Sequence, residues 1–213
     1  PPYAFAIADD QADRRRTADL INLLRAHRIE IHRSRGPFSA AGRDFAAGTF
    51  LLRLDQPYRD YAVDLLTPQE FPADAEHEPY DDISWALPMH FGVEAVPIAD
   101  ASIRDVPVAP VTDTVRAAGR VGGAGTHFVL GDTGQEALLA ARFRLRDFRV
   151  EIAEQPFTSA GTTFAAGSWR LPAQPGLGPT VEAVARELGL DFTAVTYYDG
   201  QGFLVNKKLG VKS

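Results

Sequence analysis

His27 and Glu30 form the first pair of residues whose types and spacing could do chemistry, because a histidine and a glutamate three residues apart can bind one zinc ion. A catalytic zinc site needs three protein ligands and a structural site needs four. The matching place later in the chain keeps the glutamate, Glu151, but has Phe148 where the histidine would stand. We therefore predict a structural role for His27 and Glu30, and we assign no metal ligand in this chain.

An acid-rich segment is the second candidate for metal chemistry. Its members are Asp74, Glu76, His77, Glu78, Asp81 and Asp82. Carboxylates can hold a hard cation, but this segment lacks the regular spacing and the turn glycine of a calcium loop. We predict a solvated loop, since charge runs usually face solvent. His32, His90 and His127 stand singly among apolar neighbours, and we predict ordinary packing for each of them.

Two further motifs could bind phosphate or attack a carbonyl group. The run Gly122-Gly123-Ala124-Gly125 precedes an expected strand, whereas a dinucleotide-binding glycine loop follows a strand and opens a helix, so we predict a linker. No serine lies in a G-x-S-x-G elbow, and Ser39 and Ser159 fall in expected hairpins without a nearby base. A stand-alone hydrolase that uses the scattered histidines and acids is therefore the weakest function that we consider.

Four polar residues remain as candidates for binding a small ligand. Asp10 and Gln11 follow one expected strand, and Asp132 and Thr133 follow another. Ligands of open α/β sheets bind beyond the carboxyl ends of the strands, which is where these residues fall. Capping of the next helix, by Asp9-Asp10 and by Asp132-Thr133, is the simpler interpretation, because such a cap stabilises a helix by about 1 kcal/mol.

The elements that position these residues come in two copies. Residues 28–31 (RIEI) return as RVEI at 149–152, an offset of 151 − 30 = 121. The stretch 37–50 returns at 156–169 with an offset of 157 − 38 = 119. Self-similarity of this length indicates an internal duplication, and a duplication constrains the architecture more than any single motif does.

Each copy has the same expected order of elements. An apolar strand, 3–8 or 127–130, runs through a polar turn into an amphipathic helix. The residues on the expected buried faces of these helices are Thr17, Leu20, Ile21 and Leu24 in the first copy, and Leu138, Ala141 and Leu145 in the second. A strand and a β-hairpin at 38–52 or 157–171 follow, and a helix and a strand close each copy. The unit is therefore β-α-β-hairpin-α-β.

This order predicts an α/β fold of two internally duplicated units, with largely parallel layered sheets and antiparallel hairpins, because a strand, a helix and a second strand favour a parallel pair. The domains that we expect are 1–98 with an insertion at 67–82, a connection at 99–126, and a second repeat at 127–206. Residues 207–213 read like the start of a further strand, so we expect a piece of a longer protein.

Composition narrows the class of partners. The 213 residues carry a formal net charge of −6 with the arginines spread among acids, which argues against nucleic acid as a partner. No apolar run approaches the roughly 20 residues that cross a bilayer, so we expect no membrane span. The chain has no cysteine, which removes disulfides and cysteine nucleophiles and leaves the compartment open.

Several stretches together resemble the region that follows the catalytic domain in large bacterial zinc carboxypeptidase-like proteins. They are YAFAI at 3–7, QAD at 11–13, residues 27–32, FAAGT at 45–49, QPY at 56–58 and YDDISWALP at 80–88. The resemblance implies a fold like that of class I glutamine amidotransferases, but their activity needs a cysteine nucleophile that this chain lacks. It also implies that zinc and its ligands lie upstream of Pro1.

The resemblance leads us to expect a non-catalytic accessory domain of an exported zinc metallocarboxypeptidase, periplasmic or secreted, whose partner is the upstream catalytic domain of the same polypeptide. We expect no cofactor in this chain itself. The alternative is a small-ligand or peptide-binding α/β module with a cleft between the repeats, in which Asp10 and Asp132 hold the ligand.

Overall fold

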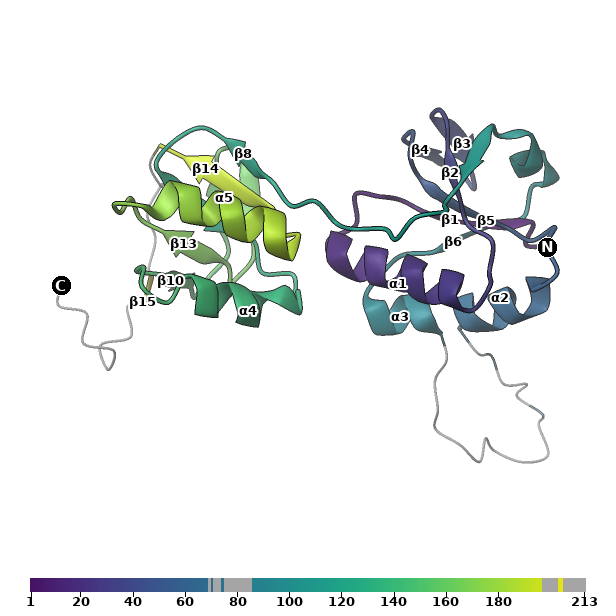
Figure 1. The fold of residues 1–213 in the computed structure, drawn as a ribbon, viewed down its shortest axis with the longest axis horizontal. Helices are drawn as coiled ribbons and strands as arrows, with labels where there is room; N and C mark the ends of the chain where they lie inside the picture. Colours follow the sequence, from purple (N-terminus) through teal and green to yellow (C-terminus); the bar gives the residue numbers. More distant parts are fainter. Residues whose placement is uncertain (69, 71–73, 75–85, 197–202, 205–213) are drawn as a thin grey trace. The chain divides into compact units, whose positions relative to one another are not determined.

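The computed structural model describes residues 1–68, 70, 74, 86–196 and 203–204. The chain divides into two compact units, Pro1–Arg116 (unit 1) and Ala117–Ser213 (unit 2). Each unit combines helices with a β-sheet, which gives the α/β character that the sequence predicts (Figure 1). The boundary between the units lies within the connection expected at 99–126.

Unit 1 is built on a five-stranded sheet with the order β6-β1-β5-β2-β7. Its strands and helices are β1 (Ala4–Ile7), α1 (Arg14–Ala26), β2 (His32–Ser34), β3 (Phe38–Ala40), β4 (Arg43–Phe45), β5 (Phe50–Arg53), α2 (Arg59–Leu66), α3 (Leu87–Phe91), β6 (Val96–Ile98), the 3-10 helix η1 (Ala101–Asp105) and β7 (Val108–Pro110). Every strand pair in this sheet is antiparallel.

Unit 2 repeats this strand order. Its elements are β8 (Val121–Gly123), β9 (His127–Leu130), α4 (Ala137–Arg144), β10 (Glu151–Ala153), β11 (Phe157–Ser159), β12 (Thr162–Phe164), β13 (Trp169–Leu171), α5 (Leu177–Leu188), β14 (Phe192–Val195) and β15 (Phe203–Leu204). The stretch β14-β9-β13-β10-β15 has the same order along the chain as β6-β1-β5-β2-β7, and β8 adds a strand outside β14.

The prediction of largely parallel sheets is wrong. β1 and β2 run in the same direction, as a strand-helix-strand unit should, but β5 lies between them and pairs antiparallel with both. β13 separates β9 and β10 in the same way. Among the described strands, β8 and β14 form the one parallel pair. The local pattern set the direction of the two strands, but it could not show that a later strand would lie between them.

Strand alternation divides the core of unit 1 into two layers. Phe5 and Ile7 of β1 point to one face of the sheet, where they pack with α1 and α2. Ala4 and Ala6 point to the other face, where they pack with Phe45 of β4 and with η1. Figure 1 shows α1, α2 and α3 on one side of this sheet and the β3–β4 hairpin on the other. The helix residues expected to be buried are buried in α1, which confirms the predicted periodicity.

Each hairpin is shorter than the sequence predicts and covers a sheet rather than extending into solvent. β3 pairs with β4, and β11 with β12, while the next strand along the chain joins the main sheet. Phe157 and Phe164 stack with ring centroids 5.3 Å apart and are buried against the unit 2 sheet. The hairpin turns use a left-handed Ala-Gly pair, as at Ala41 and Gly42 with φ of 51° and 70°. The paired aromatic residues are therefore core.

The glycine run at 122–125 is not a linker. Val121–Gly123 is strand β8, which pairs with β14 through Phe192, Thr193 and Ala194. A Cβ atom on Gly123 would lie 2.4 Å from the carbonyl oxygen of Ala194, and one on Gly125 would lie 2.1 Å from that of Val195. The backbones approach so closely that only glycine fits at these two positions.

The predicted helix caps are also wrong. Asp13, rather than Asp9 or Asp10, caps α1 and accepts the N–H groups of Arg15 and Arg16, each at 3.0 Å. α4 begins at Ala137, and its N-cap residue, Glu136, makes no side-chain capping bond. The turn after each strand is longer than the sequence suggested. Asp9, Asp10 and Asp132 therefore lie too far from the start of the next helix to cap it.

Two of the predicted segments fall largely or wholly outside the described residues, namely the insertion at 67–82 and the segment 207–213. Within the described part of the chain, no helix is both long enough and apolar enough to span a bilayer.

Candidate functional site

The four candidate ligand residues lie where the sequence placed them, just past the carboxyl ends of β1 and β9, but they belong to two separate units. Asp10 is exposed, and Gln11 lies partly buried beside it. Asp132 and Thr133 occupy the equivalent turn of unit 2. Each turn therefore belongs to the sheet of its own unit.

In unit 1 the residue that organises this turn is Asp9. Its carboxylate accepts a hydrogen bond from Arg14 at 3.1 Å, and Arg33 of β2 lies 3.3 Å away. Arg33 also donates to the carbonyl oxygen of Gly48 at 2.7 Å, and its guanidinium carbon lies 3.9 Å from the centroid of the Phe50 ring. The contacts of Asp9 and Arg33 tie the end of β1 to β2 and β5.

Gln11 ties the same turn to the segment before β6. Its amide nitrogen donates to the carbonyl oxygen of Glu94, and its amide oxygen accepts the Glu94 N–H, both at 3.1 Å. The Glu94 carboxylate accepts a hydrogen bond from Arg43 of β4 at 2.6 Å. This hydrogen bond lowers the pKa of Glu94 and raises that of Arg43. Gln11 thus holds a loop in place through backbone contacts.

In unit 2 Asp132 also serves its own loop. Its Oδ1 accepts the N–H of Gly134 at 2.8 Å, and its own N–H donates to Ser168 Oγ at 3.1 Å. A Cβ atom on Gly167 would lie 2.8 Å from Asp132 Oδ2, so the next loop approaches this carboxylate closely. The N–H of Thr133 donates to the side chain of Gln135 at 2.8 Å. The turn is held by hydrogen bonds of the kind seen in ordinary Asx turns.

The two turns differ at one decisive position. Arg33 lies opposite Phe50 in the register of unit 1, and Ile152 lies opposite Trp169 in unit 2. Unit 2 therefore has an apolar side chain where unit 1 has the arginine that binds Asp9. The strand-end turn of unit 1 carries charge pairs, and that of unit 2 is held by hydrogen bonds from backbone N–H groups to the side chains of Asp132, Gln135 and Ser168.

His27 and Glu30 do not converge. His27 ends α1, and its Nδ1 lies 2.7 Å from the hydroxyl of Tyr61 in α2. Glu30 is exposed, while the N–H and C=O of its backbone are both bound by Gln56. Glu151, which the sequence repeat aligned with Glu30, instead occupies the place of His32, because Glu151 lies opposite Arg170 as His32 lies opposite Leu51. Glu151 is buried and ion-paired with Arg149 at 2.9 Å and with Arg170 at 3.1 Å.

The remaining candidates for chemistry lie apart from one another. His32, His90 and His127 lie in β2, α3 and β9, and Ser39 Oγ donates to Asp44 at 2.5 Å. Of the acid-rich segment, Asp74 alone belongs to the described residues. Within the described part of the chain, no three histidine, aspartate or glutamate side chains come together as metal ligands could.

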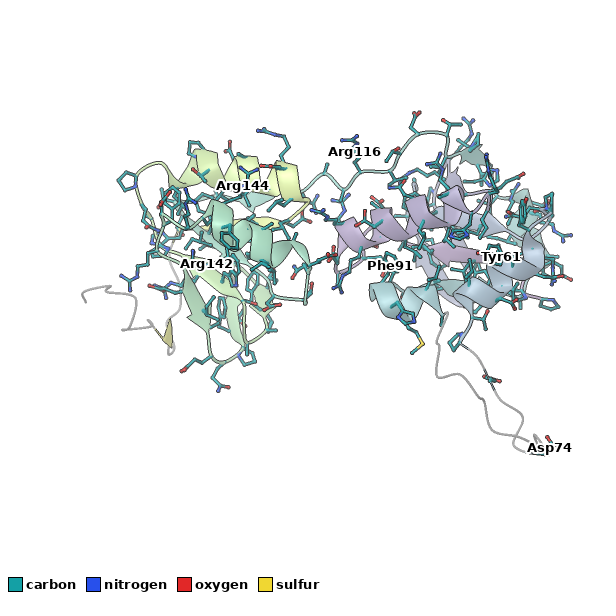
Figure 2. All side chains as sticks on the ribbon, turned by 60° about the horizontal axis from the view of Figure 1, so that its bottom comes forward. Tyr61, Asp74, Phe91, Arg116, Arg142 and Arg144 are labelled. Carbon is teal, nitrogen blue, oxygen red and sulfur yellow. The ribbon has the colours of Figure 1, made fainter. Side chains whose placement is uncertain are left out.

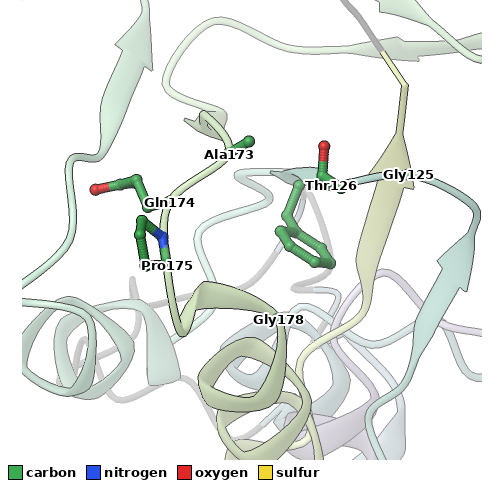
Figure 3. Close-up of a pocket in the computed structure, with 7 residues that line it drawn as sticks. Gly125, Thr126, Ala173, Gln174, Pro175 and Gly178 are labelled. Carbon is green, nitrogen blue, oxygen red and sulfur yellow. The ribbon is translucent and has the colours of Figure 1, made fainter.

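A hollow in unit 2 is a place where a ligand could fit. It has a volume of about 400 Å³, within the range of small-molecule sites. Its lining residues are Gly125, Thr126, Phe128, Ala173, Gln174, Pro175 and Gly178 (Figure 3). They come from the amino end of β9, the loop after β13 and the first turn of α5. Asp132 and Thr133 follow the opposite end of β9, so the predicted ligand residues do not line this hollow.

Sequence reasoning missed two glutamines that clamp a neighbouring backbone. The side-chain oxygen of Gln56 accepts the N–H of Glu30 at 2.7 Å, and its nitrogen donates to the Glu30 carbonyl at 3.1 Å. Gln174 makes the same pair of bonds to Arg149, at the same two distances. The signal was present, because Gln-Pro occurs at 56–57 and 174–175, an offset of 174 − 56 = 118 that lies within one residue of the offset of 119 between the hairpin stretches.

Comparisons with known proteins give one short similarity. No family model matches the chain, and no solved structure matches it. A stretch of 27 residues is 78% identical to part of the glutamate/glutamine/aspartate/asparagine-binding protein BztA of Rhodobacter capsulatus. That stretch is 13% of this chain and 8% of the curated relative, so it assigns no family to the chain.

Proposed function

We propose that the chain is a non-catalytic accessory domain of an exported zinc metallocarboxypeptidase, periplasmic or secreted, and that its partner is the upstream catalytic domain of the same polypeptide. The observation that carries the proposal is how the strand-end side chains are used. Asp9 binds Arg14 and Arg33, Gln11 binds the Glu94 backbone, and Asp132 binds its own turn. Side chains used in this way stabilise loops, as expected of a domain that presents surfaces rather than reacting groups.

We also propose that the two units arose by internal duplication. The shared strand order supports this origin, and so does the repeated glutamine clamp on Glu30 and Arg149. Two copies of one unit offer a partner two related surfaces. The difference between Arg33 and Ile152 indicates that these surfaces have since diverged.

The test compares this chain alone with a longer polypeptide that includes the upstream region. Zinc content is measured by elemental analysis, and release of C-terminal residues from peptides is measured by chromatography. We expect zinc and activity in the longer polypeptide only. Stoichiometric zinc together with C-terminal trimming by this chain alone would refute the proposal.

A second candidate function, a small-ligand-binding module, is favoured by the hollow of unit 2. The matched segment of BztA suggests four first probes, namely glutamate, glutamine, aspartate and asparagine. Binding is measured by calorimetry for Thr126→Val, which removes a hydroxyl from the lining, and for Thr133→Val at the other end of β9 as the control. Loss of binding in the first variant alone supports the hollow. A double Asp10→Asn and Asp132→Asn variant tests the cleft expected between the repeats.

A further inference from the structure

The outer face of α4 carries two large apolar side chains in solvent. Leu139 is 70% exposed and Phe143 is 66% exposed, and they lie four residues apart, one helical turn along the same face. The opposite face of α4 is in the core, where Ala137, Ala141 and Leu145 are buried. The helix therefore has a second apolar strip in addition to the one that its own fold uses.

Opposite charges stand at the two ends of this strip. Glu136, the N-cap residue of α4, precedes Leu139 by three residues. Arg146 follows Phe143 by three, in the turn after α4 ends, where its N–H donates to the carbonyl oxygen of Phe143 at 3.4 Å. Glu136 is exposed, and the Arg146 side chain is 74% exposed with a 3.9 Å contact to Asp147. Arg144, labelled in Figure 2, does not belong to the strip, and it pairs with Glu187 of α5. We call these four residues the α4 strip.

We propose that the α4 strip is a self-association surface that binds the α4 strip of a second copy of this chain in antiparallel orientation. A two-fold axis between residues 139 and 143 places Leu139 against Phe143 of the second copy. The same axis places Glu136 against Arg146 of the second copy, and the reciprocal contacts follow from the symmetry. The strip is thus complementary to itself in both apolar character and charge, which favours a second copy as the occupant.

The size of the strip determines the expected strength. α4 has eight residues, and a contact along one face of it lies below the roughly 1,200 Å² at which stable specific interfaces begin. Weak association is therefore expected, with a dissociation constant on the order of 0.1–1 mM. This inference goes beyond the accessory function and does not depend on it.

The test is sedimentation velocity of the full chain over a concentration series up to about 1 mM, the upper end of the expected range. Glu136→Arg and Arg146→Glu each place like charges together in a symmetric pair, so each variant is expected to associate about tenfold more weakly. An equimolar mixture of the two variants restores both opposite-charge contacts and is expected to associate like the original chain. Leu139→Ser removes apolar contact and is expected to abolish association.

Met89→Ser is the matched control, because Met89 is 69% exposed on α3 of unit 1 and lies outside the strip. Circular dichroism establishes that each variant is folded. Weaker association of both charge variants, together with rescue in their mixture, supports the proposal. A monomer at every concentration overturns it, and so does association that Leu139→Ser leaves unchanged.

Discussion

Replacement of Gly123 by alanine in β8 tests the close approach of two backbones in unit 2. The new Cβ atom would lie 2.4 Å from the carbonyl oxygen of Ala194, and the residue has φ of +78°. The left-handed conformation costs an alanine about 1–2 kcal/mol, and overpacking costs about 1–3 kcal/mol more. We expect Gly123→Ala to destabilise unit 2 by about 2–5 kcal/mol.

Gly122 provides a control one residue away in the same strand. Its backbone is not left-handed, and a Cβ atom there would lie 4.0 Å from its nearest neighbour, the carbonyl oxygen of Phe192. A surface change of this kind alters stability by about 0.5 kcal/mol or less, so Gly122→Ala should unfold like the original chain. The contrast between two adjacent glycines separates the combined cost of the left-handed backbone and the steric contact from the general effect of replacing a glycine in this strand.

The assay is thermal unfolding followed by the fluorescence of Trp169 in β13. The chain has two tryptophans, so the measurement is made in a Trp85→Phe background, in which Trp169 reports on unit 2 alone. A loss of 2 kcal/mol lowers the melting temperature of a domain of this size by about 8 °C or more. Hydrogen exchange of the β14 amides should accelerate in the same variant. Equal melting temperatures and equal exchange rates for the two glycine variants would show that the backbones of Gly123 and Ala194 do not approach each other as closely as described.

Three further outcomes are expected. Asp13→Ala should destabilise unit 1 by about 1 kcal/mol through the lost helix cap, whereas Asp10→Ala should change little, as denaturant unfolding would show. Gln174→Ala should cost unit 2 about 0.5–1.5 kcal/mol in the same assay, because it removes two hydrogen bonds to the Arg149 backbone at a position that water can reach. An NMR titration should show the pKa of Glu94 below its usual value, and Arg43→Ala should raise it.

The sign of the pH effect follows from the Glu94 titration. A carboxyl group whose pKa is lower in the folded than in the unfolded state stabilises the fold at neutral pH. The stabilisation by the Arg43–Glu94 pair is therefore complete above the unfolded pKa of a glutamate, and it is lost as the pH falls through the lowered pKa.

The local features of both units could be predicted from the sequence. The spacing of Thr17, Leu20, Ile21 and Leu24 predicted the buried face of α1, because a helix brings every third and fourth residue to one side. The repeat at 37–50 and 156–169 predicted two similar hairpin regions, since similar short sequences favour similar turns. The strand-end positions of Asp10 and Asp132 were also predicted correctly.

The site could be predicted only in part, because its contacts join distant segments. Arg33 binds Asp9 across 24 residues, and Gln11 binds Glu94 across 83. No local pattern identifies such partners, because any exposed arginine or glutamine could make similar bonds. The glycines of β8 were mistaken for a linker because glycine suits both a flexible connection and a close approach of two backbones.

The sequence by itself determined the strands β1 and β9, the helix α1 with its buried face, and the two similar hairpin regions, since those features depend on residues within a few positions of one another. The tertiary structure alone decided that β5 lies between β1 and β2, that Asp13 caps α1, and that β8 completes the sheet of unit 2. These features depend on which backbone N–H and C=O groups, far apart in the sequence, form hydrogen bonds with one another. Those pairings are fixed only when the whole unit packs.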